Sequence, residues 1–348
     1  MNKNLTINDR LIGENQPVYI IAEISANHTG DFELAKKMIH AAKEAGADAV
    51  KLQTYTAETI TMKCESELFK IKGGTLWDGK YLYDLYKEAY TPWEWQPLLK
   101  DYADSIGITL FSSPFDKTAI DFLEKMNVPA YKIASFEAVD IPLIEYTASK
   151  GKPVIISTGI CSETEIHEAI DACYRTGNKE VILLKCNSAY PAPLEKMNLM
   201  SIPDMKEKFN VPVGLSDHTM NVETPIAAVA LGASVIEKHF TLDRALGGAD
   251  AGFSLNIEEF SQMVRTVRNT EKLLGAPSYE VSQQSRVFAR SLFVVKDIKK
   301  GETFTEDNIR SIRPANGLPT KYLKDVVGKK ALIELKAGTP MKFEYIQK

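Results

Sequence analysis

The sequence predicts an α/β protein, a TIM (β/α)8 barrel followed by a small, mostly β domain. Over the first 275 residues, eight short apolar runs alternate with stretches of helical periodicity, which is the arithmetic of such a barrel. The runs are almost continuously apolar, as expected of parallel strands covered on both faces. After Gly275 the pattern changes to short strands and Gly-containing turns.

The strands and helices follow in strict alternation. The expected strands are 18–25, 48–55, 108–113, 130–135, 153–159, 181–188, 211–216 and 234–240. The clearest amphipathic helices are 33–46, 117–127, 162–177 and 257–275. A doubly wound open sheet is the alternative, but no GxGxxG motif follows the first strand, which disfavours a dinucleotide-binding fold.

One segment interrupts the alternation. Residues 56–92 are aromatic and punctuated by Gly, and they follow the second strand. Loops after barrel strands lie on the face where barrel active sites form. The segment is therefore either a packed surface excursion or a loop that covers a substrate.

The C-terminal part divides into two segments. We expect a barrel domain over 1–275, a polar linker over 276–290 and a small domain over 291–348. About 60 residues give a marginal core, so the small domain should gain stability by docking.

Composition narrows the class of protein. The net charge of −4 favours neither nucleic acid nor an anionic membrane as a partner. No run approaches the ~20 apolar residues that span a bilayer, and the N-terminal residues lack an apolar signal core. The four cysteines form no CxxC pair, so we expect reduced thiols in a cytoplasmic protein.

Nearly every expected strand ends in polar residues, which in a barrel indicates a catalytic face. Lys51 and Lys132, surrounded by Ser hydroxyls, suit a small multiply charged anion. A strand-borne Lys can instead form a Schiff base, as in a metal-free aldolase, and this alternative stays open.

Two histidines end the last two expected strands. His218 follows VPVGLSD, and His239 lies in SVIEKHF, so both imidazoles should reach the same end of the barrel. Two such ligands can hold one divalent metal ion, and this argues for a metal over an imine.

Several motifs carry a resemblance to a known family. IAEISANHTGD, DAVKLQTY, FSSPFD, YKIAS, CNSAYPAP, GLSDHT and IEKHFTLDR occur in family order, and the chain resembles the sialic acid synthase family along essentially its whole length. The resemblance implies a phosphoenolpyruvate-dependent barrel and a C-terminal antifreeze-like (SAF) domain. It implies condensation of phosphoenolpyruvate with an open-chain amino sugar and water, giving a nine-carbon 2-keto acid and phosphate.

The resemblance also implies roles for individual residues. Glu23 would be the general acid/base, and His218 and His239 would hold the metal, with Mn²⁺ the first choice and Mg²⁺ or Co²⁺ the alternatives. Lys51 and Lys132 would bind the phosphoenolpyruvate carboxylate. The remaining implied substrate contacts are Gln53, Ser113, Ser135, Ser157, Ser188, Tyr190, Ser216, Asp250 and Arg313. Arg313 would reach the sugar from the partner subunit of a domain-swapped homodimer.

Three branches of the family compete: N-acetylneuraminate, legionaminate and pseudaminate synthases. The segments GTLWDGKYLYDLYKEAYTPWEW and KCNSAYPAP are most similar to the pseudaminate branch, whose acceptor is 2,4-diacetamido-2,4,6-trideoxy-L-altrose. Ser188 replaces an Asn usual in the sialic acid branch. A further alternative is that the C-terminal domain is a binding module, although it carries charged residues and no apparent flat apolar face.

Overall fold

The computed structural model describes residues 4–347 and divides the chain into two compact units, Met1–Gly275 and Ala276–Lys348. The division falls where the sequence pattern changes. Each unit has its own hydrophobic core, so each is described by itself.

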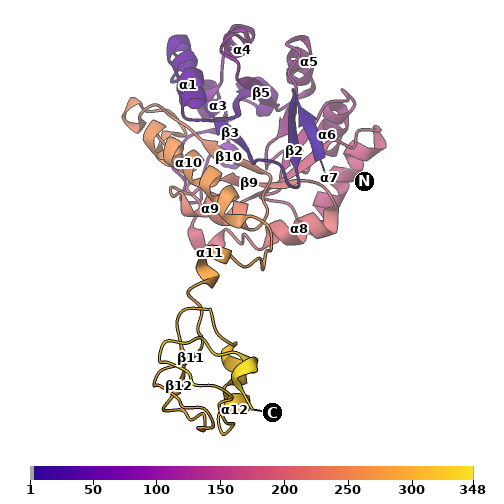
Figure 1. The fold of residues 1–348 in the computed structure, drawn as a ribbon. Helices are drawn as coiled ribbons and strands as arrows, with labels where there is room; N and C mark the ends of the chain where they lie inside the picture. Colours follow the sequence, from indigo (N-terminus) through magenta and orange to yellow (C-terminus); the bar gives the residue numbers. More distant parts are fainter. Residues whose placement is uncertain (1–3, 348) are drawn as a thin grey trace. The chain divides into compact units, whose positions relative to one another are not determined.

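The first unit is a closed parallel barrel of eight strands in the order β10-β3-β4-β5-β6-β7-β8-β9 (Figure 1). The strands are β3 Tyr19–Glu23, β4 Ala49–Thr54, β5 Thr109–Pro114, β6 Tyr131–Ile133, β7 Val154–Ser157, β8 Val181–Cys186, β9 Val213–Asp217 and β10 Val235–His239. Each lies within or beside an expected strand. Pairing of β10 with β3 closes the barrel, so the TIM prediction is confirmed and the open sheet is wrong.

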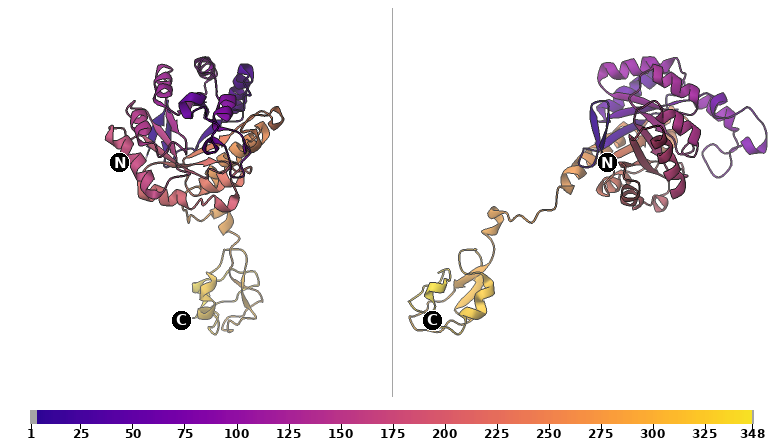
Figure 2. Two further views of the ribbon diagram at one scale, coloured as in Figure 1. Left: turned by 180° about the vertical axis from the view of Figure 1, so that it is seen from behind. Right: turned by 90° about the vertical axis from the view of Figure 1, so that its right-hand side faces the viewer.

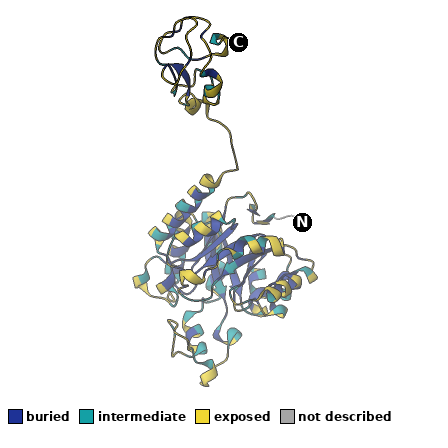
Figure 3. Ribbon diagram, turned by 90° about the horizontal axis from the view of Figure 1, so that it is seen from below, coloured by how far each residue is buried: buried dark blue, intermediate teal, exposed yellow. Residues whose placement is uncertain are grey.

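Helices surround the barrel with their outer faces exposed and the strands buried within (Figure 3). They are α1 Phe32–Glu44, α4 Trp95–Ile106, α5 Lys117–Lys125, α6 Ile141–Ala148, α7 Glu163–Arg175, α8 Ser201–Phe209, α9 Glu223–Ala230 and α10 Ile257–Leu274. Local chemistry fixes their starts: Ser162 with Glu165, and Asn256 with Glu259, form capping boxes. In the described part of the chain, no helix combines the length and hydropathy needed to cross a membrane.

Two apolar layers hold the barrel. One lies between the strands and the helices, and the other combines the barrel interior with residues of α5 and α6, among them Ile120 and Leu143. An N-terminal hairpin, β1 Asn4–Ile7 and β2 Arg10–Gly13, adds Ile7 and Ile12 to the interior layer beside Tyr19. This hairpin packs against the interior layer near the strand starts and leaves the opposite end of the barrel for the polar residues.

The excursion, defined as residues 56–92, extends beyond the helices of the barrel unit (Figure 2). It contains α2 Ala57–Ile60, the 3-10 turn η1 Glu67–Phe69 and α3 Leu82–Ala89. A bridge between Lys70 and Tyr81 closes its outer loop. Three further 3-10 turns follow later strands: η2 Leu194–Lys196, η3 Arg244–Leu246 and η4 Ala251–Phe253.

The second unit is built around one antiparallel pair, β11 Ser291–Val294 and β12 Ile309–Ile312. Short turns accompany it: α11 Gln283–Arg286, η5 Thr320–Tyr322, α12 Leu323–Val326 and η6 Phe343–Tyr345. Leu292, Phe304 and Met341 are among the residues of its small core. Apart from α11, residues 276–290 have no regular secondary structure and are mostly exposed.

Candidate active site at the carboxyl ends of the barrel strands

The structure brings almost all of the predicted site residues to one end of the barrel. Each lies on the last residues of a strand or in the segment that follows it. On the strands lie Glu23, Lys51, Gln53, Ser113, Lys132, Ser157, Ser216 and His239; just beyond them lie Ser135, Ser188, Tyr190, His218 and Asp250. Arg313 follows β12 in the second unit and is exposed there.

A chain of alternating charges crosses the barrel mouth. Lys51 Nζ lies 2.8 Å from Glu23 Oε2 and 3.1 Å from Glu237 Oε2, and Lys132 Nζ lies 3.5 Å from Glu237 Oε1. All four side chains are almost fully buried. Glu237 was not among the predicted site residues, although it lies two residues before His239 and so faces the same side of its strand.

Burial and neighbouring charges compete in setting the protonation of this chain. Burial raises the pKa of Glu237, but the charges of Lys132 and Lys51 dominate and lower it, so Glu237 stays ionised. Burial lowers the pKa of Lys51 to about 7, with Glu237 opposing this and Lys132 adding to it. Lys51 can therefore gain or lose its charge near neutral pH.

Serine residues lie on the strands next to that of Lys132, with Ser113 on β5 and Ser157 on β7, both paired with β6. Ser188 Oγ donates to Ser135 Oγ at 2.8 Å, and Ser216 Oγ donates to Glu237 Oε1 at 3.0 Å. Among the described residues, the buried hydroxyls of Ser113 and Ser157 have no hydrogen-bond partner. Unpaired buried hydroxyls beside a buried ammonium are suited to the oxygens of a bound anion.

A glycine lets the backbone approach these serines. A Cβ atom on Gly159 would lie 2.7 Å from Ser135 Oγ and closer still to Ser188 Oγ. A side chain at this position would force the Ser135 and Ser188 hydroxyls to move, so glycine lets them keep their positions. The backbone at Gly159 can therefore lie close to the hydroxyls of Ser135 and Ser188.

The two predicted metal ligands face each other. The ring centroids of His218 and His239 lie 5.4 Å apart. His218 Nδ1 donates to the Asn187 carbonyl at 2.8 Å, which leaves its Nε2 lone pair free for a ligand bond. Buried His239 Nδ1 has no hydrogen-bond partner within residues 4–347 and lies 3.8 Å from Asp250 Oδ2.

The electrostatics of the two imidazoles differ. Burial and, next, the charge of His218 hold the pKa of His239 well below its usual range, so His239 is neutral. Burial also lowers the pKa of His218, but contacts with Cys186 and the Asn187 carbonyl outweigh it and raise that pKa overall. No cluster of three or more His, Cys, Asp or Glu ligands occurs among the described residues. The donor set fits a divalent ion held by two histidines, with positions left for water or substrate.

A cavity of about 430 Å³ opens beside His239. Of the predicted residues, Gln53, Tyr190, His239 and Asp250 line it. Gln53 Nε2 donates to Ser25 Oγ at 2.9 Å, and Ser25 Oγ donates to Asp250, whose pKa is raised by burial. These polar groups form one side of a pocket of the size that holds a small organic ligand.

Glu137 also lines this cavity, and sequence periodicity does not predict it because it lies in the turn after β6. Burial raises its pKa to about 7. Its Oε2 atom is buried and has no hydrogen-bond partner in the described chain. Glu137 can therefore donate or accept a hydrogen bond from a ligand, depending on pH.

The excursion forms the apolar side of the cavity. Its lining residues are Ile60, Ile71, Thr75, Trp77, Leu82, Leu85, Tyr86 and Ala89. Trp77 Nε1 donates to the Ala249 carbonyl at 3.0 Å, which ties the excursion to the segment that carries Asp250. Of the aromatic residues of the excursion, Trp77 and Tyr86 line the cavity, whereas the Tyr83 hydroxyl donates a hydrogen bond to Glu58.

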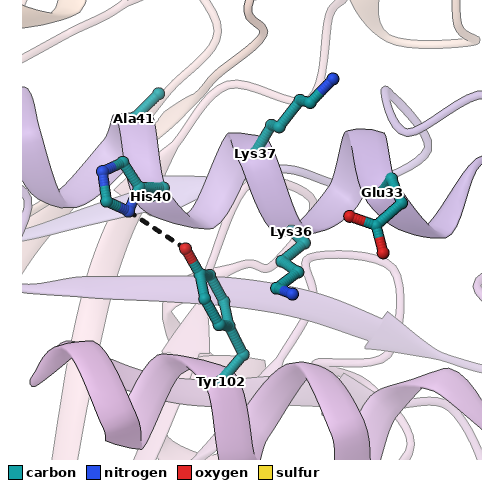
Figure 4. A pocket seen from close by; sticks show the side chains of 6 residues that line it. All are labelled: Glu33, Lys36, Lys37, His40, Ala41 and Tyr102. Atoms are coloured by element: carbon teal, nitrogen blue, oxygen red, sulfur yellow. Dashed lines mark hydrogen bonds between the residues drawn. The ribbon is translucent and has the colours of Figure 1, made fainter.

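A second hollow, of about 350 Å³, lies between α1 and α4 on the outside of the barrel (Figure 4). His40 Nδ1 and the Tyr102 hydroxyl are hydrogen-bonded at 3.1 Å across it, and Lys36 and Lys37 extend from the same helix. It contains none of the predicted site residues. Its lysines are those of a solvated helix face.

The chain matches two family models. Residues 38–279 match the NeuB family, and residues 289–344 match the SAF domain. The chain is 49% identical to a pseudaminic acid synthase of Campylobacter jejuni, covering 93% of this chain and 95% of that protein. It is 47% identical to a pseudaminic acid synthase of Helicobacter pylori, covering 96% of this chain and 99% of that protein.

More distant relatives share the architecture. An N,N'-diacetyllegionaminic acid synthase of Legionella pneumophila is 36% identical, covering 96% of both chains. The crystal structure of an N-acetylneuraminic acid synthetase from Leptospira borgpetersenii, in complex with citrate, matches with a TM-score of 0.73 and 35% identity over 81% of this chain and 94% of that one. Since the family model spans most of the barrel unit and these relatives match it nearly end to end, the chain belongs to the NeuB family.

Proposed function

We propose that the chain condenses phosphoenolpyruvate with 2,4-diacetamido-2,4,6-trideoxy-L-altrose and water, and releases pseudaminate and phosphate. The observation that carries the reaction class is the buried Glu23–Lys51–Glu237–Lys132 chain beside unpaired serine hydroxyls. The choice of acceptor is supported by the 47–49% identity to proteins named pseudaminic acid synthase, against 36% to one named for legionaminate. Legionaminate and N-acetylneuraminate remain the alternative products.

Phosphoenolpyruvate carries a carboxylate and a phosphate, and the barrel mouth offers polar groups for both. The Lys51 and Lys132 ammonium groups would hold the carboxylate, with the unpaired hydroxyl of Ser113 assisting. The hydroxyls of Ser135, Ser157, Ser188 and Ser216 would bind the phosphate oxygens. Because these groups are fixed by the barrel, little reorganisation is needed when the anion binds.

Glu23 moves the proton when water adds to the former enol carbon. Its carboxylate is 1% exposed and is held by Lys51 at 2.8 Å and Gln53 at 3.5 Å. A carboxylate fixed in this way can accept a proton from water on one side of the substrate. Gln53, Tyr190 and Asp250 orient the sugar in the adjoining cavity.

His218 and His239 would hold a divalent ion, Mn²⁺ in the first instance, with Mg²⁺ or Co²⁺ as alternatives. When bound, such an ion supplies Lewis-acid polarisation of the sugar aldehyde. The neutral state of His239 and the Nδ1–H bond from His218 to Asn187 prepare both rings as ligands. We propose that the enzyme acts on small molecules in the cytoplasm.

We also propose that the protein forms a domain-swapped homodimer. In a domain-swapped homodimer, Arg313 of one subunit would reach the sugar site of its partner. The second unit has a small core, and residues 276–290 form a mostly exposed connection to it. A guanidinium at the cavity would contact the anionic or polar parts of the substrates.

The test is phosphate release from phosphoenolpyruvate with each of the three acceptor sugars, before and after chelation and with Mn²⁺ restored. We expect preferred turnover of the trideoxy sugar, loss with chelator and recovery with Mn²⁺. His239→Ala should lower turnover by at least ~10³-fold, given the size of metal polarisation effects. Preference for N-acetylmannosamine would overturn the branch, and full activity after chelation would overturn the metal.

A Schiff-base aldolase is the second candidate, because burial lowers the pKa of Lys51 to about 7 and leaves part of the amine neutral. The ion pairs with Glu23 and Glu237 oppose it by keeping Nζ occupied. Treatment with borohydride in the presence of substrate separates the two. A covalent adduct on Lys51 or Lys132 would establish the imine.

A further inference from the structure

A second buried ion pair lies behind the two histidines and has no part in the chemistry above. Lys238 on β10 pairs in register with Asp217 on β9, and Lys238 Nζ lies 2.6 Å from Asp217 Oδ2. Both side chains are fully buried, on the strand faces opposite Glu237 and His239. They therefore do not reach the barrel mouth.

Both members of the pair bind Thr219, the residue that directly follows His218. Asp217 Oδ1 accepts a hydrogen bond from the Thr219 amide at 2.9 Å. Lys238 Nζ donates to the Thr219 carbonyl and lies 3.3 Å from Thr219 Oγ1. Lys238 directly precedes His239, and Asp217 and Thr219 flank His218. The Lys238 ammonium therefore links the residues next to one histidine with the residue next to the other.

Stability alone does not account for this arrangement. Removing two charges from water costs free energy that their attraction only partly offsets, and apolar pairs of similar volume are often as stable. The ion pair and its three bonds to Thr219 instead fix the end of β9 relative to the end of β10. A metal site tolerates displacements of about 0.5 Å in its ligands, so the relative placement of β9 and β10 matters.

We propose that the buried Lys238–Asp217 pair is a positioning device that sets the two imidazoles at the spacing needed to share one divalent cation. This rests on the proposed function, since it presumes that His218 and His239 are ligands. Neither Lys238 nor Asp217 would touch the ion or the substrates. Their loss should weaken ion binding while leaving both imidazoles present.

The test compares Mn²⁺ binding to chelator-treated full-length protein by calorimetry, with no substrates present. The double variant Lys238→Met/Asp217→Asn removes both charges and keeps the approximate shape. We expect Mn²⁺ affinity to fall by 10-fold or more, as for other groups that orient metal ligands. Turnover should return in large part at saturating Mn²⁺, whereas it should not return in His239→Ala.

The matched control is an ion pair at the other end of the barrel. Arg268 Nη2 lies 2.9 Å from Asp48 Oδ2 near the strand starts, and the pair is partly buried. Arg268→Met/Asp48→Asn should lower the midpoint of thermal unfolding and leave Mn²⁺ affinity unchanged. If both double variants weaken Mn²⁺ binding equally, the effect is general loosening, and the positioning role is overturned.

Two further outcomes separate the positioning role from the proposed function. If the wild-type chain binds Mn²⁺ and Lys238→Met/Asp217→Asn binds it equally well, the positioning role fails and the metal site stands. If the wild-type chain binds no Mn²⁺, the metal site itself fails, and the positioning role fails with it. Should the double variant not fold, Lys238→Met alone removes the ammonium and its two bonds to Thr219; unchanged Mn²⁺ affinity there also overturns the inference.

Discussion

Lys51 sits between two carboxylates that come from different strands, Glu23 on β3 and Glu237 on β10. The neighbouring strands bring them together because the pairing of β10 with β3 closes the barrel. A cation held in this way is both a structural link and a charge available to a substrate. Removing either carboxylate therefore changes the protonation of Lys51 as well as its position.

Much of this site follows from strand periodicity. Residues two apart on a strand share a face, so the ends of β3, β4 and β10 already predict that Glu23, Lys51 and His239 face inward. The same rule applied to Glu237 would have added it. Glu137 lies in a turn, where strand periodicity does not apply. Ser25 follows the end of β3, and its place in the site is indicated by its hydrogen bond to Asp250.

Glu23→Gln should fold and bind phosphoenolpyruvate, but its kcat should fall by ~10²-fold or more, because the change keeps the shape and removes the proton-transfer group. Steady-state kinetics and the thermal unfolding midpoint measure the two effects separately. Glu58→Gln, an exposed carboxylate in the excursion, is the control and should retain kcat. An unchanged kcat in Glu23→Gln would make Glu23 a structural residue.

The kcat/KM for phosphoenolpyruvate should fall as pH rises above about 7, because Lys51 has its pKa lowered to about 7 and is charged only below it. It should also fall at acid pH, because the raised pKa of His218 lets protons compete with the metal. A pH–rate profile at saturating acceptor sugar measures both limbs. A profile flat from pH 6 to 9 would contradict both assignments.

At the scale of elements, the barrel was predictable because its strands are apolar throughout and its helices are capped locally. Ser162 and Asn256 begin α7 and α10 where the amphipathic pattern begins. The N-terminal hairpin escaped prediction, since Ile7 and Ile12 are isolated apolar residues whose partner is the barrel interior. The excursion is predicted as an irregular segment, but its side of the cavity is mainly aliphatic, since of its aromatic residues Trp77 and Tyr86 alone line the cavity.

The aliphatic side of the cavity should discriminate between acceptor sugars. Ile71→Asn places an amide in the aliphatic lining, against which we expect the methyl group of the trideoxy sugar to pack. The KM for this sugar should therefore rise by ~10-fold, and its advantage over N-acetylmannosamine should shrink. Leu68→Asn is the matched control, since Leu68 is 89% exposed on the same excursion. Equal effects of the two changes, measured with both sugars, would remove the excursion from specificity.

At the scale of the whole molecule, the two units have separate cores and are joined by residues 276–290. Fully extended, fifteen residues at ~3.3 Å each would span up to ~50 Å, and α11 within this segment shortens that reach. Sequence periodicity predicted the two units, because the apolar pattern changes after Gly275. Sequence periodicity carries no signal for whether the second unit of a chain, here called its arm, serves its own barrel or that of another copy. That choice depends on contacts between copies.

Mixing two inactive variants decides whether the arms cross. Arg313→Ala disables the arm, and His239→Ala disables the barrel site. If each arm serves the partner, a mixed dimer has one site with both defects and one intact site, so random exchange should restore about a quarter of wild-type activity. If each arm serves its own barrel, every site in the mixture carries one defect and no activity returns.

The control mixes His239→Ala with Glu23→Gln, which both lie in the barrel and should not complement in either arrangement. Subunit exchange itself is followed with differently tagged copies, so that failure to complement in exchanged dimers contradicts the crossed arrangement.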